Sequence, residues 1–299
     1  MNNNKGIWYG IGAYAIWGFF PIYWKMLHSV PALQIVAHRL FWSLIFLLVV
    51  LALRKEWAGL KGALNRRTLV IYSLAACVLT INWLVYVWAV NGGFVVESSL
   101  GYFINPLVNV LLGVLFFRER LTLSKWIPIG LATVGVLYLT ISYGSLPWIS
   151  LALAFSFGIY GALKKLAPLN SLYGLTVETS VLVVPCLAYL LLVEVQGTGA
   201  FGHGTLLENV LMILAGVVTA VPLLLFSSAA HSIPLSTMGI LQYVAPTIQF
   251  FLGVFIYGEP FNLERLVGFV IIWVALVIFT AGGFYEQRRQ AAAAASPAR

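Results

Sequence analysis

The chain has 299 residues, of which 61% are hydrophobic and 9% are charged, and its formal net charge is +8. Soluble domains carry about 25% charged residues, so this composition excludes a globule that faces water on all sides. The protein is expected to use lipid as its solvent, and the lipid bilayer is its first predicted partner.

The backbone of a chain in lipid must form its hydrogen bonds internally, which leaves α-helices or a closed barrel. Barrel strands alternate over segments of about ten residues, whereas this sequence has long apolar runs such as residues 40–53 and 267–281. Turn signals and charges divide the chain into ten segments, each long enough to cross a bilayer as a helix. We therefore predict an all-α integral membrane protein with ten transmembrane helices. In chain order they cover residues 6–27, 32–53, 68–90, 94–117, 123–142, 147–163, 170–193, 206–228, 235–257 and 262–284.

Positive charge is distributed unevenly between the two sides of these predicted spans. Fourteen of the seventeen Lys and Arg residues fall on one side, two fall on the other, and Arg39 lies inside the second span. An excess of this size predicts that the richer side is cytoplasmic. Because the number of spans is even, both termini are expected there, with residues 285–299 as a disordered cytoplasmic tail. The basic residues are explained by orientation, and we expect no nucleic-acid partner.

The chain contains an internal repeat. Residues 106–125 and 246–265 align at an offset of 140, and six of twenty positions are identical, including a proline, a glycine and a glutamate. The offset corresponds to about five helices, and because five is odd the second copy is expected to lie inverted. The sequence thus predicts a first five-helix repeat over residues 1–143 and an inverted one over 146–284. This architecture is typical of transporters with a substrate site near the membrane midplane.

Polar and ionisable side chains at membrane depth are costly and are therefore functional candidates. In the first span, Trp17, Pro21 and Lys25 lie on one stripe, where Pro21 can kink the helix. In the second span, Arg39 lies about eight residues from the start, with His38 beside it. Arg39 is expected to bind an anionic or polar substrate group or a gate carboxylate. The alternatives are that Arg39 and Lys25 extend to the interface, or that Arg39 fixes helix packing.

Further candidates follow in the third and fourth spans. Asn82 and Tyr86 are one turn apart in the third span. Glu97 enters the fourth span near its outer end, either as a proton-coupling group or as an interfacial carboxylate. Along the fourth span, Tyr102, Pro106 and Asn109 are spaced at i, i+4 and i+7. Polar groups that flank a helix-weakening proline are a pointer to a midplane site, although hydrogen bonding between helices is the alternative.

The second half of the sequence repeats this pattern. Gln242, Pro246 and Gln249 reproduce the stripe 140 residues later, which makes the two prolines candidate hinges. Tyr160 in the sixth span is a further cavity candidate. Glu178 lies about eight residues into the seventh span, with no Lys or Arg beside it in sequence. It is expected to take part in proton coupling, or else to be a protonated packing residue.

Three stretches resemble the EamA-type transporters of the drug/metabolite transporter superfamily. They read IWGFFPIYWK at residues 16–25, PALQIVAHRL at 31–40, and PLVNVLLGVLFFRERLTLSKWIPIGLATVGV at 106–136. The wording YFINPLVNVLLGVLFFRERL at residues 102–121 is similar to the RarD branch. The resemblance extends over nearly the whole chain, to about residue 284. It implies ten spans in two inverted repeats and alternating-access export of small metabolites or drugs across the bacterial inner membrane.

Two other classes of protein can be weighed against a secondary transporter. A membrane-embedded enzyme acting on lipid or a lipid-linked substrate would be expected to cluster charged or His residues at one face, beside a long loop. The loops here extend to only about a dozen residues, and the four histidines show no metal spacing. A structural or sensory subunit would not require the inverted repeat. We therefore expect no enzymatic activity, no cofactor and no metal, and leave the oligomeric state open.

Overall fold

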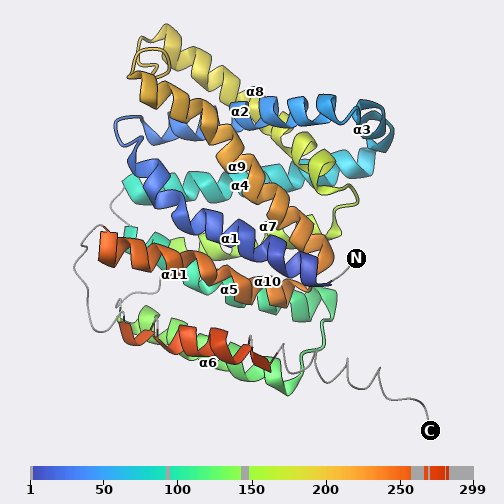
Figure 1. The fold of residues 1–299 in the computed structure, drawn as a ribbon, viewed down its shortest axis with the longest axis vertical. Coiled ribbons are helices and arrows are strands. Elements are labelled where there is room, and N and C mark those ends of the chain that lie inside the picture. The colour runs from blue at the N-terminus through green and yellow to red at the C-terminus, as the bar shows by residue number, and fades with distance from the viewer. Residues whose placement is uncertain are drawn as a thin grey trace.

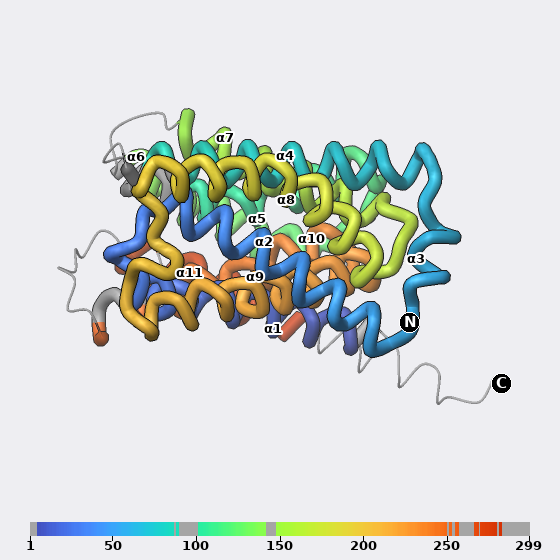
Figure 2. Tube along the Cα trace, turned by 90° about the horizontal axis from the view of Figure 1, so that it is seen from above, coloured from blue at the N-terminus to red at the C-terminus, as the bar shows by residue number. Residues whose placement is uncertain are grey.

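The computed structural model describes residues 3–91, 95–142, 148–256, 266–268, 270–279 and 281–282, and within these ranges it contains helices and turns but no strand. Six of the described helices are long and apolar enough to span a membrane. The chain is therefore an all-helical, multi-pass membrane protein, seen from two directions in Figures 1 and 2. The elements are α1 (Asn3–Lys25), α2 (Ala32–Leu53), α3 (Trp57–Ala63), α4 (Arg66–Asn91), α5 (Val95–Phe117), α6 (Leu123–Ser142), α7 (Trp148–Leu166), α8 (Ser171–Val195), α9 (Leu206–Ser232), α10 (Leu235–Gln242), α11 (Val244–Phe251) and the π-helical segment η1 (Leu252–Ile256).

The first eight predicted spans coincide closely with α1, α2 and α4 to α9, and two differences stand beside them. The short helix α3 lies in what the sequence suggested was a loop. The ninth predicted span, residues 235–257, is broken at Tyr243 into α10 and α11. Pro246 provides the physical reason, because it has no N–H to donate to the Gln242 carbonyl. The predicted tail at 285–299 and the stretch between residues 257 and 265 lie outside the described residues.

The main packing joins helices from opposite ends of the sequence. Helix α1 packs against α9, α10 and α11, while α7 packs against α4 and α5, and α2 contacts both α8 and α9. The most extensive contacts all join a helix that precedes residue 143 to one that follows residue 147. Figure 2 shows α4 and α8 on one side of the bundle and α1 and α9 on the other. The two halves of the chain therefore share one core.

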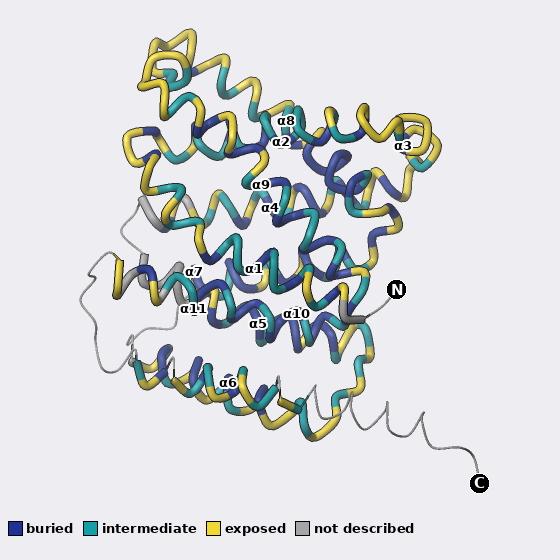
Figure 3. The backbone as a smooth tube through the Cα atoms, viewed as in Figure 1, coloured by how far each residue is buried: buried dark blue, intermediate teal, exposed yellow. Residues whose placement is uncertain are grey.

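Helix α6 lies at one edge of the bundle, against the described helical residues between 266 and 282 (Figure 1). Ala132, Val136 and Leu139 form a buried cluster there with Ile272 and Ala275. Exposed positions recur along the helices in Figure 3, and many of the exposed residues have large apolar side chains. A surface of this kind is expected where lipid covers the protein.

Candidate functional site

A cavity of about 340 Å³ lies between helices of the two halves. Its walls come from α1, α2, α4 and α5 of the first half and from α7, α9, α10 and α11 of the second. Aromatic side chains supply most of the apolar wall, and five polar groups converge among them. The aromatic residues are Tyr14, Trp17, Phe20, Trp24, Trp83, Tyr86, Tyr102 and Phe157, and the polar residues are Arg39, Asn82, Asn105, Gln242 and Gln249. A mostly apolar pocket with a few polar groups is the usual form of a small-molecule site.

Trp17 anchors the aromatic wall from the middle of α1. Its ring centroid lies 5.6 Å from those of Tyr14 and Phe226 and 5.9 Å from that of Phe157. These rings come from α1, α7 and α9, so both halves of the chain contribute to the aromatic wall and to the packing behind it. Contacts at these distances between tilted rings are energetically favourable and hold the wall in place.

Arg39 is the charged residue of the cavity. Its guanidinium carbon lies 4.4 Å from the ring centroid of Trp83 and 5.3 Å from that of Trp24, both within the range of cation–π attraction. Its Nε is buried and has no hydrogen-bond partner among the described residues. The hydroxyls of Tyr86 and Tyr102 lie within electrostatic range of the guanidinium. Among the described residues, the cavity lining contains no Asp or Glu that could neutralise this charge.

The amide side chains tie neighbouring helices together around the cavity. Asn82 Nδ2 donates to the Leu153 carbonyl at 2.9 Å and to Ser156 Oγ at 2.8 Å, and Asn105 Nδ2 donates to the Ala154 carbonyl at 2.8 Å. Each bond joins a first-half helix to α7. These hydrogen bonds fix the position of the cavity wall. Arg39 remains as a charged hydrogen-bond donor in the lining.

The two proline-centred stripes meet at the crossing of α5 and α10. Asn109 Nδ2 donates to Gln242 Oε1 at 2.8 Å, although the residues are 133 positions apart. Gln249 Nε2 donates to the Trp17 carbonyl at 3.2 Å. The structure thus brings the repeated stripes together, with Gln242 and Gln249 lining the cavity and Asn109 buried just behind it.

The structure places the residues predicted from sequence in three groups. Arg39, Trp17, Pro21, Asn82, Tyr86, Tyr102, Gln242, Pro246 and Gln249 line the cavity. Lys25, His38, Pro106, Asn109 and Tyr160 do not belong to the lining. The side chain of Glu97 lies outside the described residues.

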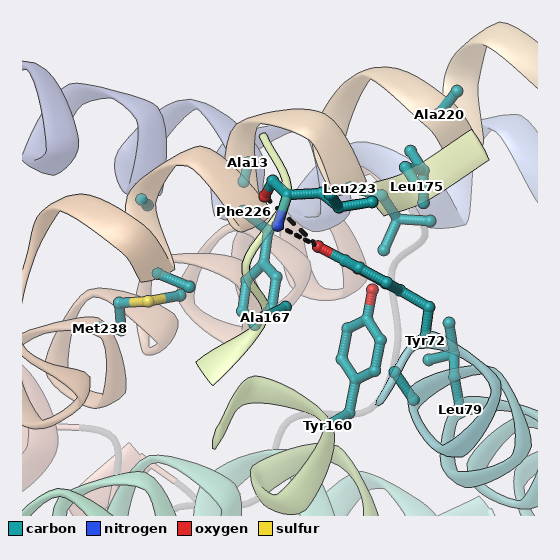
Figure 4. Packing of buried hydrophobic residues seen from close by; sticks show 14 of the residues in the cluster. Ala13, Tyr72, Leu79, Tyr160, Ala167, Leu175, Ala220, Leu223, Phe226 and Met238 are labelled. Carbon is teal, nitrogen blue, oxygen red and sulfur yellow. Dashed lines mark hydrogen bonds between the residues drawn. The ribbon is translucent and has the colours of Figure 1, made fainter. Parts of the chain in front are cut away.

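The residues outside the lining have other surroundings. Lys25 is an exposed residue at the last position of α1. His38 turns away from the cavity, and its ring centroid lies 5.1 Å from that of Phe201. The ring of Tyr160 stacks on that of Phe226 with a centroid distance of 5.8 Å, within the buried apolar cluster drawn in Figure 4. Trp24 and Asn105 were missed from the sequence, because neither lies on the polar stripes that marked the other candidates.

Glu178 has a partner that the sequence did not reveal. Lys164 Nζ lies 2.8 Å from Glu178 Oε2, and both side chains are essentially inaccessible to solvent. The ammonium also lies 5.2 Å from the ring centroid of Tyr72, whose hydroxyl is bonded to the Leu169 backbone (Figure 4). The partner comes from a neighbouring helix: Lys164, one residue beyond the predicted sixth span, is a buried residue of α7.

Glu119 joins the two halves at the same end of the bundle. Its carboxylate accepts hydrogen bonds from Leu235 N at 2.7 Å, Ser236 N at 3.1 Å and Ser236 Oγ at 2.6 Å, and Lys165 Nζ lies 3.4 Å away. It therefore caps the N-terminal end of α10. Burial opposes ionisation, but the bonds from Ser236 and Leu235 and the Lys165 charge hold the pKa of Glu119 below its usual value.

These contacts make one end of the bundle, hereafter the Glu119 end, compact and cross-linked. Lys165 Nζ also donates to the Ile233 carbonyl at 3.0 Å, and His231 Nε2 lies 2.9 Å from the Ala167 carbonyl. The cavity lies toward the opposite end, hereafter the Lys25 end, and reaches Trp24, the penultimate residue of α1.

Comparison with known proteins places the chain in context. The family described as the EamA-like transporter family matches residues 4–141 and 146–281. The uncharacterized transporter YojE of Bacillus subtilis (strain 168) is 46% identical over 281 residues, which cover 92% of this chain and 93% of that protein. The protein RarD of Escherichia coli (strain K12) is 41% identical over 286 residues, covering 95% and 97%. A solved crystal structure has the same fold, with a TM-score of 0.72 at 14% identity over 94% of this chain and 98% of the other.

Proposed function

Because the chain belongs to the EamA-like transporter family, with RarD proteins among its relatives, we propose that it is a secondary transporter that exports small organic solutes across the bacterial inner membrane. The observation that carries this proposal is the cavity of about 340 Å³ between the two halves, with aromatic walls and converging polar groups. The family and the names of the relatives indicate a transporter rather than the alternative, a membrane-embedded enzyme.

The proposed architecture is ten helices in two inverted five-helix repeats. The helix contacts support it. If each first-half helix is replaced by its second-half equivalent (α1 by α7, α2 by α8, α4 by α9, and α5 by α10 and α11) and the reverse, one observed helix–helix contact becomes another observed contact. The contact of α1 with α9 becomes that of α7 with α4, and the contact of α2 with α9 becomes that of α8 with α4. Two exchangeable halves are what alternating access requires.

The excess of Lys and Arg at the Glu119 end supports placing that end, and both termini, in the cytoplasm. In this orientation the cavity lies toward the periplasm, while the contacts of Glu119, Lys165 and His231 close the cytoplasmic end. Export then requires a second state, in which these contacts separate and the helices close around the cavity at the Lys25 end.

The test is flux across a membrane that contains only this protein. Purified chain is reconstituted in liposomes, and the movement of radiolabelled aromatic carboxylates, amino acids and an amphenicol is compared with that in protein-free vesicles. Ala245→Trp places a large ring in the cavity and is expected to block flux. The matched control is Ala52→Trp, on the exposed surface of α2.

Two results would refute the proposal. One is that no compound crosses faster than in protein-free vesicles. The other is that Ala245→Trp and Ala52→Trp give the same rate of flux. A proton gradient across the same vesicles examines the proposed coupling role of Glu178. Flux that is insensitive to the gradient would remove this role while leaving transport in place.

A further inference from the structure

We infer that the cavity selects a planar aromatic compound that carries one negative charge, such as an aromatic carboxylate, and that Arg39 is the residue that determines this specificity. The inference deepens the proposed function by naming a substrate class for the same cavity. It can be measured as binding alone, so it can be judged separately from transport.

The first argument is the uncompensated charge. Of the lining residues that the structure describes, Arg39 is the cation and none carries a carboxylate. Its guanidinium is held between Trp83 and Trp24, and its Nε has no hydrogen-bond partner within the described part of the chain. A guanidinium in a poorly solvated site attracts an anion strongly, and it binds carboxylates through two parallel hydrogen bonds.

The second argument is the lack of a partner for a positive ligand group. An amino acid would bring an ammonium group next to a fixed positive charge, into a cavity whose described lining residues offer no carboxylate. Asn82 Oδ1 can accept a hydrogen bond from an ammonium group, but a neutral amide oxygen does not offset the repulsion between that group and the Arg39 charge. The lining residues therefore favour a simple anion over a zwitterion, and a zwitterion over a cation.

The third argument is shape. The wall opposite the polar groups consists of rings such as Trp17 and Phe157, whose centroids are 5.9 Å apart. Flat aromatic surfaces match a flat apolar ligand. A volume of about 340 Å³ is at the small end of the range for ligand pockets, which extends from roughly 300 to 1,000 Å³, so one or two fused rings are suitable.

A comparison of the two halves provides a fourth, independent argument. Arg39 and Glu178 are each seven residues beyond the start of their helix, α2 from Ala32 and α8 from Ser171. Lys25 and Lys164 each precede the start of the following helix by seven residues. The second half therefore pairs Lys164 with Glu178 at 2.8 Å, whereas the first half has cations at both positions. The carboxylate of Glu178 has a guanidinium, Arg39, as its counterpart in the first half, and a substrate can bring a carboxylate to that position.

The experiment uses three probes with one ring system and different charge: naphthalene-2-carboxylate, naphthalene-2-carboxamide and 2-(aminomethyl)naphthalene. Binding to the full chain in lipid nanodiscs is measured by equilibrium dialysis. Wild type is expected to bind the acid about 10- to 100-fold more tightly than the amide, because a hydrogen bond to a charged group is worth this much. The amine is expected to bind most weakly.

Variants identify the residue responsible. Arg39→Gln is expected to reduce the affinity for the acid to that for the amide and to leave the amide unchanged. Arg39→Lys keeps the charge without the planar fork, so it should retain a reduced preference for the acid. Lys61→Gln removes an exposed charge from α3 and serves as the matched control, with wild-type affinities expected.

The inference is overturned if wild type binds the amide as tightly as the acid, if it binds none of the probes, or if Arg39→Gln keeps the preference for the acid. The wild-type comparison needs no variant, so it decides the question even if a variant does not fold. Flux separates the two proposals. If the acid binds selectively but does not cross the membrane, the proposed transport function is refuted. If the amine crosses and Arg39→Gln does not change flux, the proposed substrate class is refuted.

Discussion

Removal of the Glu178 charge is expected to destabilise the protein severely. Glu178→Gln leaves the Lys164 ammonium buried, with 0% of its side chain exposed, and without its carboxylate partner at 2.8 Å. Loss of one partner of a buried ion pair typically costs about 3–5 kcal/mol, because the remaining charge is neither paired nor hydrated. For a chain of this size, such a loss corresponds to a fall in the melting temperature of roughly 5–10 °C.

The assay is thermal unfolding of the purified protein in detergent, monitored by circular dichroism. A matched control lies in the same helix, because Glu194→Gln removes a carboxylate whose side chain is 54% exposed and whose partner is His203. Exposed pairs contribute about 0–1 kcal/mol, so the control should change little.

A double variant separates charge from packing. Lys164→Met combined with Glu178→Gln removes both charges and is expected to recover most of the lost stability, because the penalty comes from the unpaired ion. The reasoning is refuted if Glu178→Gln melts at the same temperature as Glu194→Gln, or if the double variant is less stable than Glu178→Gln.

Three further predictions concern the joint between the halves and the orientation of the chain. Glu119→Gln should lower the free energy of unfolding by about 1–2 kcal/mol through loss of the α10 cap, as measured by denaturant unfolding at neutral pH. Because the pKa of Glu119 is lowered in the folded protein, the stability that its charge provides is complete above about pH 4.3 and is lost as the pH falls through the folded pKa. The free energy of unfolding of the variant should therefore depend less steeply on pH across this range. An unchanged slope would contradict the role of Glu119 as a charged cap of α10. Gly239→Ala places a Cβ 2.5 Å from the Pro106 carbonyl oxygen and should lower the free energy of unfolding by roughly 1–3 kcal/mol. The control Gly62→Ala meets nothing within 4 Å and should be neutral or slightly stabilising in the same thermal assay. Equal effects of the two substitutions would disprove the close crossing of α5 and α10. A C-terminal fusion to alkaline phosphatase should be inactive and one to a fluorescent protein should be bright, and the reverse pattern would place the termini outside the cytoplasm.

Much of this fold could be predicted from the sequence because hydrophobic length specifies a membrane helix with few competing solutions. Most of the predicted spans match described helices within a few residues. The repeated stripes were also informative: Gln242 and Gln249 line the cavity, and Asn109 bonds to Gln242. Identical spacing in two copies places equivalent side chains on equivalent helix faces, but it did not predict the bond between Asn109 and Gln242.

The remaining features depend on tertiary contacts that spacing does not encode. Lys164 and Lys165 both follow the predicted sixth span, yet the side chain of Lys164 turns inward to Glu178 while that of Lys165 reaches Glu119. Glu119 caps a helix that begins 116 residues later, and no local pattern indicates this partner. His38 was grouped with Arg39 because they are neighbours, but adjacent residues on a helix project about 100° apart. The ring of His38 therefore meets Phe201 and not the cavity.

The central claim is that one cavity is reached alternately from the two sides of the membrane. Cysteine accessibility tests it most directly: Ala245→Cys is introduced into a chain in which Cys77 and Cys186 are replaced by alanine, and a membrane-impermeant maleimide is applied to intact cells and to inverted vesicles. Ala245 lines the cavity, so the account predicts labelling from both sides, with slower labelling in the presence of naphthalene-2-carboxylate. Labelling from one side alone would show a pocket that never changes sides, and would contradict transport by alternating access.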